Sequence, residues 1–248
     1  MRECSKSIQR RLRDSRFVRH FFAGEGIDIG GKPDPLSLYK EFFPLVSSVR
    51  TWDLEDGDAQ FLAGVGDGEV DFVHSSHCLE HLADPFEGLR NWFRAVKEGG
   101  WLIVIVPDED LYEQGVFPSS YNRDHKWTFT VFKGSSWSHR SVNVLDLLRG
   151  LGEGAEVIKV EVLSESYRFD LPRFDQTLTP VGESGIEFVV RKRLSAESVR
   201  QSGYRREGKS LEREMRIHLN QYQDDMRSMK ECNSVRPPFQ NDGPLEGE

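Results

Sequence analysis

Short apolar segments that alternate with a helical pattern constrain the fold of this chain more than any other feature. Between the third and the fourth segment, apolar residues recur at helical spacing, which predicts a helix over residues 85–97 that Glu98-Gly99-Gly100 terminates. Buried strands that alternate with helices predict a parallel sheet with right-handed crossovers. The four segments span residues 26–31, 49–53, 70–74 and 101–106.

The pattern changes after the fourth segment. Residues 107–141 are rich in aromatic, histidine and aspartate residues and show no period, and a long irregular insert in a compact domain usually has a function. We interpret this insert as a cover over the substrate. A helix near 142–151 and strands near 155–164 and 185–191 follow, and the two strands predict an antiparallel edge.

The predicted fold is therefore α/β, a Rossmann-like, doubly wound and mostly parallel sheet with an antiparallel edge, a lid insert and a C-terminal helix. The domain spans residues 23–193. Residues 1–22 predict a basic helix, which is either a solvated face or a lid over a cofactor pocket.

The C-terminal part has a different composition. Residues 194–232 predict a charged amphipathic helix with a narrow apolar stripe. This helix packs either on its own domain or, through residues 207–230, on a second copy in a homodimer. Residues 233–248, rich in proline, glycine and acids, predict a disordered tail.

Composition excludes several classes of protein. The formal net charge of −8 argues against a nucleic-acid partner, because phosphate binding needs a basic face. The 3 cysteines are far apart, which argues against a disulfide framework or a zinc-thiolate site. No apolar run approaches the ~18 residues of a membrane span, and the N-terminus lacks the apolar core of a secretory signal. A cytoplasmic protein without membrane contact is expected.

Candidate ligand-binding residues follow the strands, where open α/β sheets bind their ligands. Gly30 and Gly31 permit a close approach of the backbone to a ligand, and Asp53 offers acceptors for both ribose hydroxyls of a nucleoside. The phosphate-binding fingerprint GxGxxG is missing after the first strand, so a nucleoside without phosphates fits better than NAD. Further candidates at these ends are Asp58, Ala59, Ser75, Ser76 and His77.

Five segments in order resemble the motifs of class I S-adenosylmethionine-dependent methyltransferases, of the methyltransferase type 11-like kind, and together they cover about residues 20–110. One departure is Lys32, which stands where the family usually has a second glycine. The segments are Ile27-Asp28-Ile29-Gly30-Gly31, Trp52-Asp53, Gly57-Asp58-Ala59-Gln60, residues 72–85 and Lys97-Glu98-Gly99-Gly100.

The resemblance implies S-adenosylmethionine as the cofactor and assigns the contacts. Its methionine part would lie on Asp28, Gly30 and Gly31. Asp53, with its neighbour Leu54, would hold the ribose. The adenine would meet Asp58 and Ala59, and the sulfonium would lie near Ser75, Ser76 and His77.

Methyl transfer from a sulfonium is an in-line displacement, so the protein mainly aligns the acceptor and excludes water. A hydroxyl or protonated amine acceptor also needs a general base, and histidine suits that role. We expect His125, in the insert, to be this base, with His77 as the second candidate. Either histidine could instead only fix a loop or bind substrate.

The segment His77-x-x-Glu80-His81 is similar to the Glu-x-x-Glu-His of methyltransferases that act on small-RNA 3′ ends and in ubiquinone synthesis, where it binds a divalent metal. Together with His125 it would supply three nitrogens and one oxygen. Leu-Glu-His also occurs in relatives that bind no metal, so a metal is not the expectation.

The sequence thus predicts a methyltransferase acting on an oxygen or nitrogen of a small molecule or glycan, as in sugar or natural-product biosynthesis. The glycan preference rests on a loose similarity to methyltransferases of such pathways. The alternative is a non-catalytic methyltransferase-like protein that binds a cofactor or a partner.

Overall fold

The computed structural model describes the backbone of residues 3–200 and the side chains through residue 197. The homodimer surface predicted over residues 207–230 and the tail predicted over 233–248 lie outside the described residues. Of the predicted C-terminal extension, only the start is described, as the short helix α4 (Ser195–Arg200).

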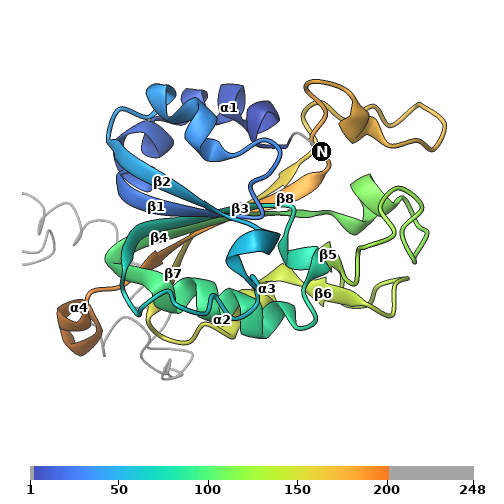
Figure 1. Cartoon of the computed structure of the whole chain (residues 1–248). Coiled ribbons are helices and arrows are strands. Elements are labelled where there is room, and N and C mark those ends of the chain that lie inside the picture. Colours follow the sequence, from blue (N-terminus) through green and yellow to red (C-terminus); the bar gives the residue numbers. More distant parts are fainter. Residues whose placement is uncertain (1–2, 201–248) are drawn as a thin grey trace, which may run out of the picture. The chain divides into compact units, whose positions relative to one another are not determined.

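A six-stranded sheet forms the centre of the molecule (Figure 1). Its first four strands run parallel, since β1 pairs with β2 and β3, and β3 pairs with β4. Strand β8 is antiparallel to both β4 and β7. The mostly parallel sheet with an antiparallel edge is thereby confirmed. In spatial order the strands are β2 (Val46–Trp52), β1 (Gly24–Ile29), β3 (Val70–Ser76), β4 (Val96–Pro107), β8 (Gly185–Lys192) and β7 (Ala155–Leu163).

The strand order reverses beside β1, because β2 lies on one side of it and β3 on the other. In the register of these pairs, Ile29 at the end of β1 lies opposite Trp52 on β2 and Ser75 on β3. The carboxyl ends of three strands therefore meet at one edge. This switch point is where open α/β sheets bind ligands.

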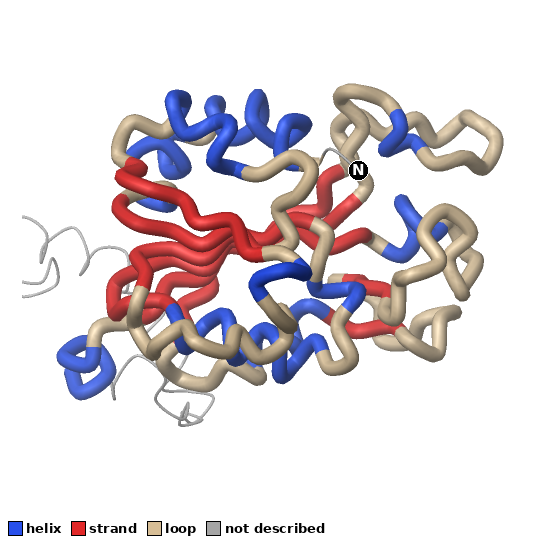
Figure 2. The backbone as a smooth tube through the Cα atoms, viewed as in Figure 1, coloured by secondary structure: helices blue, strands red, loops and turns tan. Residues whose placement is uncertain are grey.

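Helices cover both faces of the sheet, as Figure 2 shows. One face carries α1 (Cys4–Arg13), a π-helix (Phe17–Phe21) and a 3₁₀ helix (Leu36–Phe42). The other carries α2 (Pro85–Ala95) and α3 (Val144–Arg149). Because successive strand residues point to opposite faces, Phe72 and Ile103 join the core under α1, whereas Val73 and Val104 join the core under α2.

Helix α2 shows how local sequence sets an element's limits. Asp84 caps its start by accepting hydrogen bonds from the backbone nitrogens of Phe86 (2.8 Å) and Glu87 (3.1 Å), and Pro85 occupies the first turn. The helix ends at Ala95, two residues before the predicted end, because the backbone is already extended at Val96, where β4 begins.

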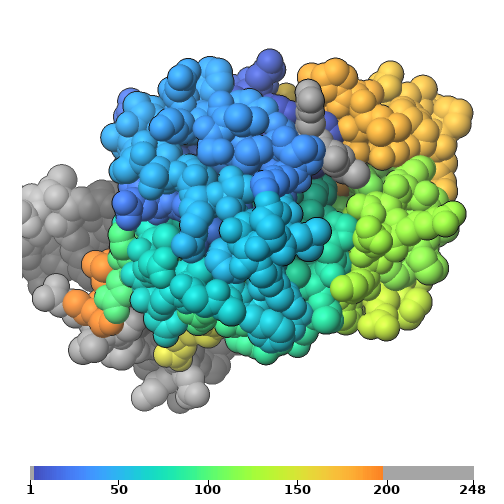
Figure 3. All heavy atoms as spheres, viewed as in Figure 1, coloured from blue at the N-terminus to red at the C-terminus, as the bar shows by residue number. Residues whose placement is uncertain are grey.

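The insert over 107–141 is largely irregular, as predicted. It holds a π-helix (Glu109–Glu113) and β5 (Thr128–Thr130), which pairs with β6 (Ser141–Asn143) in a small separate sheet. The insert and the segment 164–184 lie side by side (Figures 1 and 3), and the Gln114 side-chain amide donates to the Phe174 carbonyl at 2.8 Å.

The N-terminal segment differs from the single basic helix predicted over 1–22. The helix is interrupted at Asp14, and the interpretation of a solvated basic face is wrong for Arg11, whose side chain is fully buried, while Leu12 is exposed. The reason is Glu187 on β8, also fully buried, whose carboxylate accepts a hydrogen bond from Arg11 Nε at 3.0 Å. A buried carboxylate needs a buried cation beside it.

Candidate functional site

Two adjoining cavities open at the carboxyl edge of the parallel strands and share Gly30 and His81 in their walls. The Asp53 cavity, of about 470 Å³, lies beyond β2 and is lined by Asp53, Leu54, Asp58 and Ala59 among others. The His77 cavity, of about 190 Å³, lies beyond β1 and β3. Its walls include Asp28, Gly31, Ser76, His77, Glu80, His125 and, from the N-terminus, Glu3 and Cys4.

The Asp53 cavity combines two carboxylates with an apolar surface. Asp53 accepts hydrogen bonds from the backbone nitrogens of Leu54 (2.8 Å) and Lys32 (3.0 Å), which hold its carboxylate at the tip of β2. Asp58 accepts from the backbone nitrogen of Gln60 at 2.8 Å. Leu54 is 92% exposed, so its side chain is accessible in the wall of this cavity.

Lys32, the departure from the family pattern, connects the two loops. Its backbone nitrogen donates to Asp53, and its side chain pairs with Glu55. Any residue except proline can make the backbone contact. The glycine expected at this place is therefore not needed to position Asp53.

Gly30 is required by the backbone at the junction of the cavities. Its φ is +70°, in the left-handed region, and a Cβ atom there would lie 2.7 Å from the Cβ of Cys78. A Cβ on Gly31 would lie 2.4 Å from Oδ2 of Asp28. Burial raises the pKa of the Cys78 thiol, so this cysteine stays protonated beside the cavities.

Asp28 belongs to a buried chain of polar groups under the site. Its Oδ1 lies 2.6 Å from His74 Nδ1, and its Oδ2 accepts from the Leu36 backbone nitrogen at 2.6 Å. Arg11 Nη1 lies 3.0 Å from His74 Nε2, so His74 accepts there and donates through Nδ1 to Asp28. Burial lowers the pKa of His74, and the neutral ring fits these contacts. Sequence reasoning missed His74 and Arg11.

The three residues predicted at the tip of β3 have different positions. Ser75 is buried, lines neither cavity and donates to the Ile29 carbonyl at 3.0 Å, so the geometry gives no support for its predicted cofactor contact. Ser76 and His77 line the His77 cavity. His77 has a φ of +57°, and its Nδ1 lies 3.4 Å from Glu80 Oε1. Burial alone would lower the pKa of His77, but the carboxylates of Glu80 and Glu3 outweigh it and raise the pKa.

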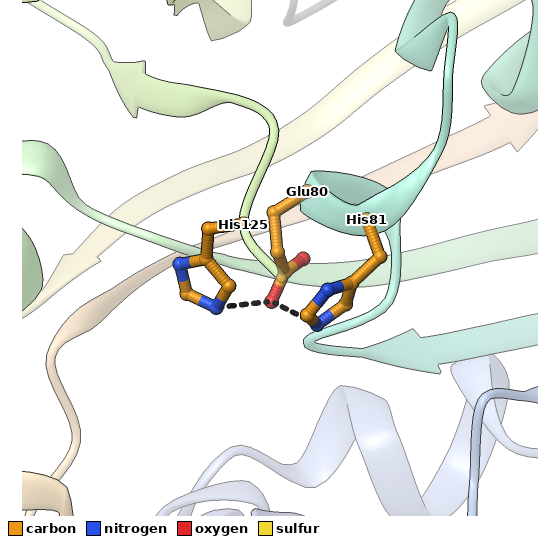
Figure 4. Close-up of side chains that lie close together, drawn as sticks. All are labelled: Glu80, His81 and His125. Carbon is orange, nitrogen blue, oxygen red and sulfur yellow. Dashed lines mark ion pairs between the residues drawn. The ribbon is translucent and has the colours of Figure 1, made fainter. Parts of the chain in front are cut away.

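Glu80, His81 and His125 converge in the wall of the His77 cavity, as Figure 4 shows. Glu80 Oε1 lies 3.9 Å from His81 Nε2 and 3.8 Å from His125 Nε2. In the described part of the chain these three residues form a cluster whose potential ligand atoms all lie within 4.8 Å of one another, and His77 is outside it. His125 is held by Glu113, at 2.7 Å between Nδ1 and Oε1, a partner that no sequence pattern indicated.

Residues 12–154, more than half of the chain, match the family model of a methyltransferase domain. The chain belongs to this methyltransferase family. The predicted class I S-adenosylmethionine-dependent fold is thereby confirmed, and with it S-adenosylmethionine as the cofactor. No curated protein matches the chain.

The chain is similar to several solved methyltransferase structures at low sequence identity. The chain is similar to an S-adenosylmethionine-dependent methyltransferase from Archaeoglobus fulgidus (16% identity, TM-score 0.48, covering 74% of this chain and 93% of that one). It is also similar to phosphoethanolamine N-methyltransferase 2 of Haemonchus contortus in complex with S-adenosylmethionine (15% identity, TM-score 0.49, 75% of this chain and 53% of that one). Within residues 3–200, no helix of this methyltransferase is long and apolar enough to cross a membrane.

Proposed function

We propose that this methyltransferase is catalytic and transfers the methyl group of S-adenosylmethionine to an oxygen or nitrogen atom of a small molecule or glycan. The observation that carries the proposal is the pair of adjoining cavities at the switch point of the sheet. One has the carboxylates and apolar surface that suit a nucleoside, and the other is lined by histidines. Because they share Gly30, one elongated ligand can reach from the first into the second.

The residues of the Asp53 cavity fit the adenosine part of the cofactor. Asp53 retains lone pairs for the two ribose hydroxyls, since each of its oxygens accepts only one backbone hydrogen bond. Asp58 and Ala59 then meet the adenine, and Leu54 offers an apolar surface to its ring. Gly30, Gly31 and Asp28 border the methionine part, which puts the sulfonium near Gly30 and the acceptor in the His77 cavity.

The chemistry requires alignment and a proton acceptor. The sulfonium supplies an activated methyl group, so the cavity walls need only hold the acceptor in line and exclude water. We assign the proton from the acceptor to His77. Its Nδ1 lies 3.4 Å from Glu80 Oε1, which can stabilise the imidazolium that forms, and Nε2, 3.8 Å from Glu3 Oε2, is the nitrogen that takes the proton. His125, whose Nδ1 lies 2.7 Å from Glu113 Oε1 and whose Nε2 lies 3.8 Å from Glu80 Oε1, is the second candidate.

Calorimetric titration with S-adenosylhomocysteine and S-adenosylmethionine tests whether the protein binds the cofactor. We expect both to bind. Turnover is then measured with radiolabelled donor on a panel of sugar, amino-sugar and aromatic acceptors. His77→Gln should keep the affinity for S-adenosylhomocysteine and lower kcat by roughly 10²–10⁴-fold, the usual contribution of a general base.

His20→Gln is the matched control, because His20 is an exposed histidine that lines neither cavity. It should leave both the affinity and kcat unchanged. If neither cofactor form binds, the enzymatic proposal is wrong and a non-catalytic role takes its place. If His77→Gln turns over at the wild-type rate, His77 is not the proton acceptor.

A further inference from the structure

Of the cluster of Glu80, His81 and His125, the proposed methyl transfer uses only Glu80, beside His77. We propose that the cluster is a binding site for one divalent transition-metal ion, held by a carboxylate oxygen of Glu80 and by Nε2 of His81 and of His125 (Figure 4).

The carboxylate of Glu80 is buried without a hydrogen bond, since neither of its oxygens accepts one. Burying a carboxylate without partners is costly, so such groups in folded proteins pair with cations or coordinate metals. Ring nitrogens of three histidines lie 3.4 to 3.9 Å from Oε1.

The imidazoles of His81 and His125 are both oriented by an acceptor on Nδ1. His125 Nδ1 lies 2.7 Å from Glu113 Oε1, and His81 Nδ1 lies 3.1 Å from the Asp124 carbonyl oxygen. Both partners are acceptors, so each Nδ1 carries the proton, and in a neutral ring Nε2 then carries the lone pair. Two lone pairs directed at a carboxylate repel it unless a cation lies between them. Metal-binding histidines are typically held in this way, through a carboxylate or carbonyl acceptor on the other nitrogen.

The distances suit a metal after a small contraction. Two ligand atoms bound tetrahedrally to zinc at about 2.1 Å lie about 3.4 Å apart. The nitrogen–oxygen separations here are 3.8 and 3.9 Å, about half an ångström longer than that, and all three ligand atoms lie within 4.8 Å of one another. Two imidazoles and one carboxylate are a ligand set used by zinc and by iron(II).

The ion would keep open coordination positions toward the His77 cavity, because all three ligands line that cavity. An acceptor hydroxyl that occupied such a position would lose its proton more readily, as metal-bound water does. This role toward the acceptor rests on the proposed function. Metal binding itself does not.

Metal titration of the full chain tests the site directly. The protein is stripped with a chelator, desalted and titrated with cobalt(II), whose visible d–d absorption reports nitrogen and oxygen ligation, and then with zinc(II) as a competitor. We expect one cobalt ion per chain, displaced by zinc. Glu80→Gln and His125→Gln should each weaken binding by at least about 100-fold, and Glu113→Gln by roughly 10–100-fold, as for other residues that orient a metal ligand.

The controls separate this proposal from the proposed function. His20→Gln should bind cobalt as the wild type does, and S-adenosylhomocysteine affinity is measured on every variant to show that it is folded. If the wild type binds S-adenosylhomocysteine but no stoichiometric cobalt, or if Glu80→Gln binds cobalt with unchanged affinity, the metal site is wrong while the cofactor site stands. If the wild type binds cobalt but not S-adenosylhomocysteine, the metal site stands and the proposed function is wrong.

Discussion

Replacement of Glu187 by glutamine should destabilise the fold strongly, because three cations depend on this one buried carboxylate. Its oxygens accept hydrogen bonds from Arg11 Nε (3.0 Å), Arg10 Nη1 (2.7 Å) and Lys159 Nζ (2.8 Å). Burial by itself would raise the pKa of Glu187, but the two arginines and the lysine outweigh burial and hold this pKa far below its usual value.

The loss of stability depends on which carboxylates each cation still contacts after Glu187 is replaced. Arg10 retains Glu183, and Lys159 retains Glu161. Among the described residues, Arg11 has no second carboxylate within ion-pair distance, and its guanidinium is fully buried. Breaking a buried ion pair from one side costs about 3–5 kcal/mol. Since glutamine keeps an oxygen that can accept a hydrogen bond, we expect the low end of this range at pH 7.

The assay is urea unfolding of wild type and Glu187→Gln between pH 7 and pH 3. The pKa of Glu187 is lower in the folded state than its ordinary 4.5. The stabilisation is therefore fully present above about pH 4.5 and declines as the pH falls below that value. The difference between the two proteins should be largest at pH 7 and shrink toward pH 3.

Glu161→Gln is the control, because it also removes one carboxylate from the charged groups around Lys159. Glu161 is 41% exposed and pairs with Lys159, so its removal should cost no more than about 1 kcal/mol. If Glu187→Gln destabilises the protein as little as this control, or if the loss does not change with pH, then the ionised carboxylate of Glu187 does not stabilise the fold through its ion pairs.

Three further changes give measurable outcomes. Gly30→Ala should lower both the Tm and the affinity for S-adenosylhomocysteine for two reasons. A positive φ costs an alanine roughly 1 kcal/mol, and the new Cβ would in addition lie 2.7 Å from the Cβ of Cys78. Gly115→Ala, at φ +83° with no atom within 4 Å of its Cβ, should show the conformational cost alone, and equal effects of the two would contradict the steric argument. Asp53→Asn should weaken S-adenosylhomocysteine binding by about 10–100-fold in calorimetry, the loss expected for charged hydrogen bonds, and an unchanged Kd would remove Asp53 from the ribose site. Burial raises the pKa of Asp108 to about 6 in the folded protein. Ionising this buried carboxyl therefore lowers the stability of the fold as the pH rises from about 4 to 6. Asp108→Asn should therefore gain up to about 3 kcal/mol relative to wild type at pH 8 and little at pH 3.5, and an equal effect at both values would contradict this.

The sequence alone determined the sheet, its antiparallel edge and part of the wall of the Asp53 cavity, namely Gly30, Asp53, Leu54, Asp58 and Ala59. These features depend on local signals. Apolar strands, a glycine-ended turn and an acid after a strand are each written in a few consecutive residues, and the short hydrogen bond from the Leu54 nitrogen to Asp53 is itself local. The parallel topology then brings the strand ends together without further information.

Only the tertiary structure decided which distant side chains meet. Glu187 buries Arg11 from 176 residues away, and His125 Nε2 faces Glu80 only because the insert folds back onto the segment after β3, where the Lys126 backbone nitrogen donates to the Glu80 carbonyl. Ser75, predicted at the cofactor, instead donates to the Ile29 carbonyl, because strand pleating directs it away from the cavities. Such pairings leave no periodic trace in a sequence, since a charge on a helix is usually solvated and becomes buried only when a partner lies beneath it.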